Sequence, residues 1–86
     1  MILADVVAQT LQIEPQALDD RSRPANTSNW DSLRHIEVMM AIEIAFGVTF
    51  SMAEMSAMRH LGDIAALLRE KGCEPGPLPE ALEAAA

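Results

Sequence analysis

The 86-residue sequence lacks several of the residues that build stabilised or catalytic sites. Cys73 is its one cysteine, so an intramolecular disulfide is excluded. Tyrosine is absent, and one tryptophan and two phenylalanines are the only aromatic residues, so aliphatic residues, alanine and methionine must build the core. A chain of this length makes one domain with a small core, which argues against a deep catalytic pocket and against an enzyme.

Basic residues are also scarce, because six lysines and arginines face thirteen acidic residues and the formal net charge is −7. Such a charge repels nucleic acid and steers basic protein partners towards the chain. No apolar run has the length of a membrane span, and no signal-like segment is present, so we expect a cytoplasmic protein. The two histidines and Cys73 are not spaced as metal ligands, so no metal site is expected.

Helical patterns dominate the sequence and predict an all-α fold, a small bundle of three longer helices and one short helix. Apolar residues at helical spacing indicate the first helix over residues 2–12. A second helix is predicted over 32–46, where Gly47 stops it, and a last one over about 62–71. The short helix is opened by the capping box Ser51-Met52-Ala53-Glu54.

Two segments lie outside these helices. Residues 18–30 form a long connection rich in turn-forming residues, and loops of this length inside small domains are usually functional. The second segment begins with the helix-breaking cluster Cys73-Glu74-Pro75-Gly76-Pro77 and continues into an alanine-rich end. We therefore expect residues 1–72 to form the domain and residues 73–86 to form a flexible C-terminal tail.

The 32–46 helix carries two apolar stripes where a surface helix of a small bundle needs one. Asp31 or Ser32 caps its start. One stripe contains Val38, Ile42, Ala45 and Phe46, and the nearly opposite one contains Leu33, Ile36, Met40 and Ile44. Another helix can bury the second stripe, or it can stay exposed for partners. Its position next to a serine at the helix start favours exposure.

These features resemble the acyl carrier protein family. The resemblance rests on Asp31-Ser32-Leu33 at the start of a helix after a long polar loop. It continues through Ile36-Glu37, Met40-Ala41-Ile42-Glu43, Phe46-Gly47-Val48 and Leu61-Gly62-Asp63-Ile64. The tripeptide alone recurs by chance, but its place within four helices of the right order is specific. The likeness covers most of residues 1–71.

The resemblance implies that Ser32 carries a 4'-phosphopantetheine arm derived from coenzyme A. In that family the serine hydroxyl attacks the pyrophosphate of coenzyme A inside a separate phosphopantetheinyl transferase, and the thiol of the arm then carries acyl groups as thioesters. Asp31 is expected to help present the serine. Acyl-loading and acyl-transfer enzymes are expected to dock on a monomeric carrier through Leu33, Ile36, Glu37, Met40 and Glu43. The carrier itself needs no catalytic group.

Three positions depart from the fatty-acid carriers of this family. Trp30 stands where glycine is frequent, and Arg34 and Ile44 replace acidic residues. We therefore expect a stand-alone carrier with a Trp-Asp-Ser-Leu motif that serves a specialised lipid, polyketide or surface-glycan pathway. The alternatives are a peptidyl or D-alanyl carrier and an unmodified helical adaptor domain.

Two further expectations concern packing. His35 is expected to pack near Trp30 rather than to act as a base. Met52 and Met55 have the spacing of a core face of the short helix, and ordinary packing is the expected role of these adaptable side chains. By resemblance, the space between helices can open to take an acyl chain.

Overall fold

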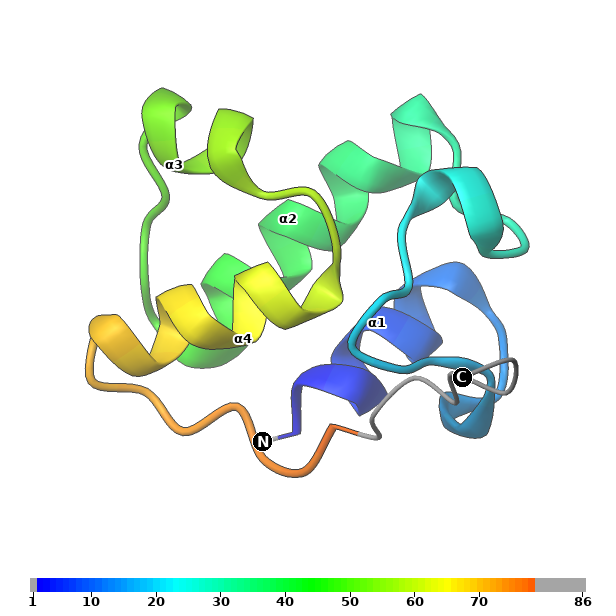
Figure 1. Cartoon of the computed structure of the whole chain (residues 1–86), viewed down its shortest axis with the longest axis horizontal. Helices are drawn as coiled ribbons and strands as arrows, with labels where there is room; N and C mark the ends of the chain where they lie inside the picture. The colour runs from blue at the N-terminus through cyan, green and yellow to red at the C-terminus, as the bar shows by residue number, and fades with distance from the viewer. Residues whose placement is uncertain (1, 79–86) are drawn as a thin grey trace, which may run out of the picture.

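Four α-helices and two short 3₁₀ turns form the structure, a computed structural model that describes residues 2–78 (Figure 1). No strand occurs among these residues, in agreement with the predicted all-α bundle. The elements follow in the order α1 (Leu3–Leu11), η1 (Pro15–Ala17), η2 (Pro24–Asn26), α2 (Ser32–Phe46), α3 (Met52–Ala57) and α4 (Leu61–Glu70). The bounds of α2 are those predicted, and the ends of α1 and α4 differ from prediction by one residue.

The core lies between the apolar faces of the three longer helices. α1 packs against α2, and α4 crosses in front of α2 (Figure 1). Each helix contributes side chains at helical spacing, which removes one apolar face of each from water. The fully buried members are Leu3, Val7, Leu11, Leu18, Val38, Ile42, Leu61, Ile64 and Leu68. Trp30 and Phe50 add the larger rings to this core.

The ends of the middle helices follow local chemistry. α2 stops at Gly47, which adopts a left-handed backbone with φ of 67°. The predicted capping box opens α3, since Ser51 Oγ accepts a hydrogen bond from the Glu54 N–H (3.1 Å) and Glu54 Oε1 accepts one from the Ser51 N–H (2.8 Å). α3 has six residues, none of them buried, so it lies at the edge of the bundle.

The connection over residues 18–30 is tied to the ends of two helices. The first N–H groups of α4, those of Leu61 and Gly62, donate to the carbonyl oxygens of Ser22 and Asp20, each at 2.8 Å. Asn29 Nδ2 donates to the carbonyl of Leu11 at the end of α1 (3.0 Å). A Cβ at position 62 would lie 2.9 Å from the Asp20 carbonyl oxygen, so this close approach requires glycine. The connection is therefore part of the packed structure.

The segment after α4 returns to the start of α1 (Figure 1). The Leu3 N–H donates to the Pro75 carbonyl at 2.8 Å, and the Pro75 side chain is fully buried. Leu78 packs partly against the core. Residues 73–78 lie against α1, because Leu3 offers an orphan helix N–H that the Pro75 carbonyl satisfies. The flexibility expected from residue 73 stays a prediction. Residues 79–86 lie outside the described residues, and the boundary at 72 stays a prediction.

Shortening the chain tests this boundary. A chain ending at residue 72 loses the Pro75 carbonyl and the buried prolyl ring, so we expect it to be less stable than a chain ending at residue 78 by about 1–3 kcal/mol. Urea unfolding followed by circular dichroism measures the difference. Equal unfolding midpoints for the two chains would show that the domain ends at residue 72, as the sequence predicts.

Candidate functional site

Ser32 is the first residue of α2 and is exposed. Asp31 caps the helix, because its Oδ1 accepts a hydrogen bond from the Arg34 N–H at 2.8 Å. The sequence left open which of these two residues is the cap, and the structure identifies Asp31. Within residues 2–78 the Ser32 hydroxyl makes no hydrogen bond, so its oxygen is available to react with an external group.

The start of α2 also suits a negative charge. The N–H groups of Ser32 and Leu33 belong to the first turn and have no partner within the described residues. The aligned peptide dipoles of this 15-residue helix favour an anion at this end, typically by about 0.3–1 kcal/mol. A phosphodiester on Ser32 Oγ therefore fits the residues present.

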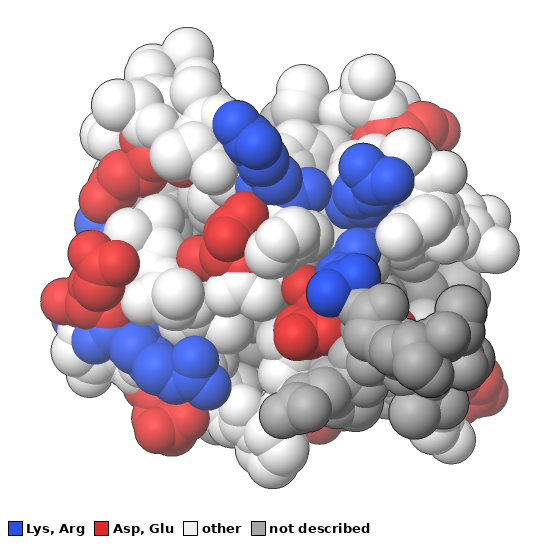
Figure 2. All heavy atoms as spheres, viewed as in Figure 1, with Lys and Arg blue, Asp and Glu red and all other residues white. Residues whose placement is uncertain are grey.

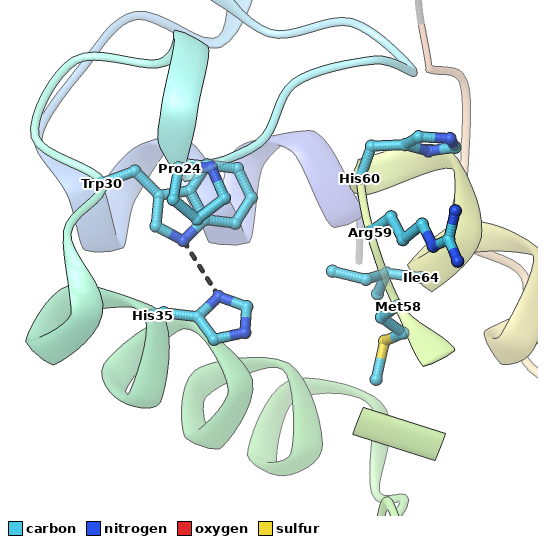
Figure 3. Close-up of a pocket in the computed structure, with 7 residues that line it drawn as sticks. All are labelled: Pro24, Trp30, His35, Met58, Arg59, His60 and Ile64. Carbon is cyan, nitrogen blue, oxygen red and sulfur yellow. Dashed lines mark hydrogen bonds between the residues drawn. The ribbon is translucent and has the colours of Figure 1, made fainter. Parts of the chain in front are cut away.

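Buried Trp30 and half-buried His35 form a pair beside the start of α2 (Figure 3). Trp30 Nε1 donates a hydrogen bond to His35 Nδ1 at 3.1 Å, and the two rings stack with centroids 6.0 Å apart. This confirms that His35 packs near Trp30. Burial lowers the pKa of His35, which favours the neutral imidazole that accepts from the indole.

The second apolar stripe of α2 is exposed, as its position next to the serine indicated. The exposed fractions are 68% for Leu33, 58% for Ile36, 56% for Met40 and 80% for Ile44. The opposite stripe is buried at Val38 and Ile42 but only half-buried at Ala45 and Phe46. An exposed apolar stripe of this kind is typical of a surface that binds partners.

The two acidic residues predicted on this face differ in their surroundings. Glu37 is exposed, and its Oε1 lies 3.6 Å from Arg34 Nε. Glu43 is half-buried, and its Oε2 accepts a hydrogen bond from the Phe50 N–H at 2.8 Å. Glu43 therefore fixes the chain between α2 and α3. A docking role for Glu43 stays a prediction.

A hollow of about 280 Å³ between α2 and α3 is lined largely by methionine. Its lining includes Ile36, Met39, Met40, Met52 and Met55. Met55 packs partly against the core, as its spacing predicted. The same prediction is wrong for Met52, which is 79% exposed because the short α3 lies at the edge of the bundle. Flexible thioether side chains make this hollow adaptable in shape.

Some residues near the site were not found by sequence reasoning. Arg34 Nη1 donates to the Thr10 carbonyl at the end of α1 (3.0 Å), which ties α1 to α2. Arg21, Arg23 and Arg59 line one hollow, although they come from two separate loops. No local pattern reveals either contact, because 24 residues separate Thr10 from Arg34 and 36 separate Arg23 from Arg59.

The sequence matches one known protein family. The model of a family described as "phosphopantetheine attachment site" matches residues 2–68, which is most of the chain. Domains of this family are the sites at which 4'-phosphopantetheine is attached covalently. No curated protein matches the sequence. Within residues 2–78 no helix is long and apolar enough to cross a membrane. No group of three or more acidic, histidine or cysteine residues in that range could hold a metal ion.

The Trp30–His35 pair predicts a pH dependence of stability. Because the pKa of His35 is lowered from 6.5 in the folded state, the unfolded chain binds more protons in this range. The free energy of unfolding should therefore rise with pH between the lowered pKa and 6.5, and this stabilisation is lost as pH falls through that window. His35→Gln keeps an acceptor for the indole but does not titrate.

Urea unfolding at several pH values measures this effect. We expect the wild-type chain to lose more stability than His35→Gln as the pH falls below 6.5, while the carboxylates contribute equally to both. Identical pH profiles for the two chains would contradict a lowered pKa of His35 in the folded state.

Proposed function

Since the chain belongs to the phosphopantetheine attachment-site family and is a phosphopantetheine carrier, we propose that it is an acyl carrier protein with Ser32 as the attachment residue. One observation carries the proposal. Asp31 caps α2, which leaves the Ser32 hydroxyl exposed and without a hydrogen-bond partner in the described chain. We propose no catalytic group on the chain itself, because a separate phosphopantetheinyl transferase supplies the base that takes the serine proton.

The loading reaction uses three properties of the start of α2. Ser32 Oγ forms a bond to the phosphorus nearest the pantetheine, and the pyrophosphate bond of coenzyme A breaks. Adenosine 3',5'-bisphosphate leaves, and the serine proton passes to the transferase. Asp31 holds the first turn in place, and the free N–H groups of Ser32 and Leu33 favour the phosphodiester charge. Once attached, the arm supplies a terminal thiol that holds acyl groups as thioesters.

Partner enzymes are proposed to dock on the exposed stripe of α2. Leu33, Ile36 and Met40 supply apolar area next to Ser32, and Glu37 supplies a negative charge. An apolar patch with an acidic rim fits a partner whose surface is apolar and basic. Arg34 reduces the negative charge of this face by its ion pair with Glu37. This supports a carrier that serves a dedicated lipid, polyketide or surface-glycan pathway.

The methionine-lined hollow between α2 and α3 supports acyl cargo over aminoacyl cargo. Its lining is mostly apolar, with Glu43, His35 and Ser56 as the polar members, so a hydrocarbon chain gains by leaving water there. A peptidyl or D-alanyl carrier remains the second candidate, and both would be loaded at the same serine. An unmodified adaptor has no use for the free hydroxyl of Ser32.

Intact mass measurement tests the attachment residue. We expect incubation with coenzyme A and a broad-specificity phosphopantetheinyl transferase to add one phosphopantetheinyl group to the wild-type chain and none to Ser32→Ala. Ser28→Ala, in the exposed part of the connection, is the matched control and should be modified at the wild-type rate. A modified Ser32→Ala chain, or an unmodified wild-type chain, would refute the proposal.

Reversing the charge of Glu37 tests the docking face. We expect Glu37→Lys to lower kcat/KM of the transferase for this carrier by about fivefold, because the change repels a basic partner and removes the ion pair with Arg34. Added salt should reduce the effect. Glu70→Lys on α4 makes the same charge change at an exposed site and should keep wild-type kinetics. Equal losses in both variants would indicate net charge rather than docking.

A further inference from the structure

A small recess lies beside the Trp30–His35 pair and shares His35 with the methionine-lined hollow. Its volume is about 120 Å³. Its apolar lining comes from Pro24, Trp30, Met58 and Ile64, and His35, Arg59 and His60 complete it. In Figure 3, Trp30 and His35 form one side of the recess, and Arg59 and His60 lie at the opposite side. The recess therefore combines an apolar interior with a cationic edge.

A second, wider hollow of about 550 Å³ beside the recess is lined in part by arginine. Arg21, Arg23 and Asn26 from the connection line this hollow together with Arg59 and His60, and the last two residues also line the recess. Arg59 and His60 therefore form an edge that the two spaces share. Figure 2 shows basic side chains on the face that carries the connection and the start of α4, with acidic side chains beside them. Half of the six basic residues of the chain line this one hollow.

Among the described residues, two arginines of this edge have no acidic partner. Neither Arg23 nor Arg59 has an ion pair within residues 2–78. Asp63 is one acid near this edge, and its Oδ2 accepts a hydrogen bond from the Arg59 N–H (2.9 Å) and lies 3.7 Å from His60 Nδ1. In a chain with twice as many acids as bases, unpaired arginines at one edge indicate a preference for an anion from outside.

The volume of the recess and the arginine at its edge indicate what kind of anion fits. An engineered apolar cavity of about 150 Å³ binds benzene, so a recess of similar size suits a short alkyl chain or a single ring. Guanidinium groups bind carboxylates through two parallel hydrogen bonds. The combination selects a molecule that is apolar at one end and anionic at the other.

We propose that the recess binds a short apolar group that ends in a carboxylate, with the carboxylate held by Arg59 and Arg23. The site stands next to the attachment residue, because Trp30 precedes Ser32 by two positions and His35 follows it by three. A free short-chain acid and the end of an acyl group tethered to Ser32 both offer this chemistry. The tethered source rests on the proposed function and would make the cargo a carboxylate-terminated acyl group.

Binding of free probes tests the recess without any modification of Ser32. We expect hexanoate to shift the indole N–H resonance of Trp30 and the amide resonances of Arg59 and His60 in a proton–nitrogen correlation spectrum. Hexanol has the same apolar chain without the charge and should bind about tenfold more weakly, as should inorganic phosphate, which lacks the chain. Arg59→Gln should weaken hexanoate binding by about tenfold.

Arg69→Gln is the control variant, because it removes the same charge from an exposed position on α4 and should bind hexanoate like the wild-type chain. Equal binding of hexanoate and hexanol would overturn the proposal. So would equal binding of hexanoate and phosphate, which would indicate a general anion patch. Hexanoate shifts at Met52 and Met55 instead would place the site in the methionine-lined hollow.

Loading with two matched thioesters separates the two sources. A broad-specificity transferase can attach the butyryl and succinyl forms of the arm, which have equal carbon numbers and differ in the terminal carboxylate. Shifts of Trp30 and Arg59 in the succinyl form alone would support tethered cargo, and identical spectra would assign the recess to a free acid. Intact mass reports loading separately, so failure of Ser32 to be modified leaves the hexanoate result to decide the recess.

Discussion

The hydrogen bonds from the first turn of α4 to the connection are the contacts on which the proposed attachment site depends. The Leu61 and Gly62 N–H groups bind the carbonyls of residues 22 and 20, which fixes the middle of a long polar segment against the core. Asn29 then binds the end of α1, and Trp30 enters the core directly afterwards. The chain therefore reaches Asp31 with a defined direction, and α2 begins at a fixed place.

Features set by neighbours in sequence were predicted well. The bounds of α2 and the capping box of α3 depend on contacts within three or four residues, so the residue types alone indicate them. The choice between Asp31 and Ser32 as cap was open, because both side chains can accept from a first-turn N–H. The backbone decides it, since Asp31 is extended while Ser32 is already helical.

Features set by distant parts of the chain were not predictable in this way. The sequence pattern places Gly62 at the start of a helix. Glycine is required there because the Asp20 carbonyl, 42 positions earlier, leaves no room for a Cβ. Pro75 reads as a helix breaker, yet its carbonyl completes the first turn of α1. Met52 has core spacing, but a six-residue helix at the edge of the bundle buries little. In each case tertiary packing, which periodicity does not encode, decides the outcome.

His35 connects the chemistry of the site with the shape of its surroundings. It lines both the methionine-lined hollow and the recess with the arginine edge, so one imidazole forms part of the wall between them. A buried indole N–H without an acceptor would cost about 1–3 kcal/mol, and His35 removes that cost only while it is neutral. The charge state of His35 therefore bears on both spaces at once, one helical turn from the proposed attachment residue.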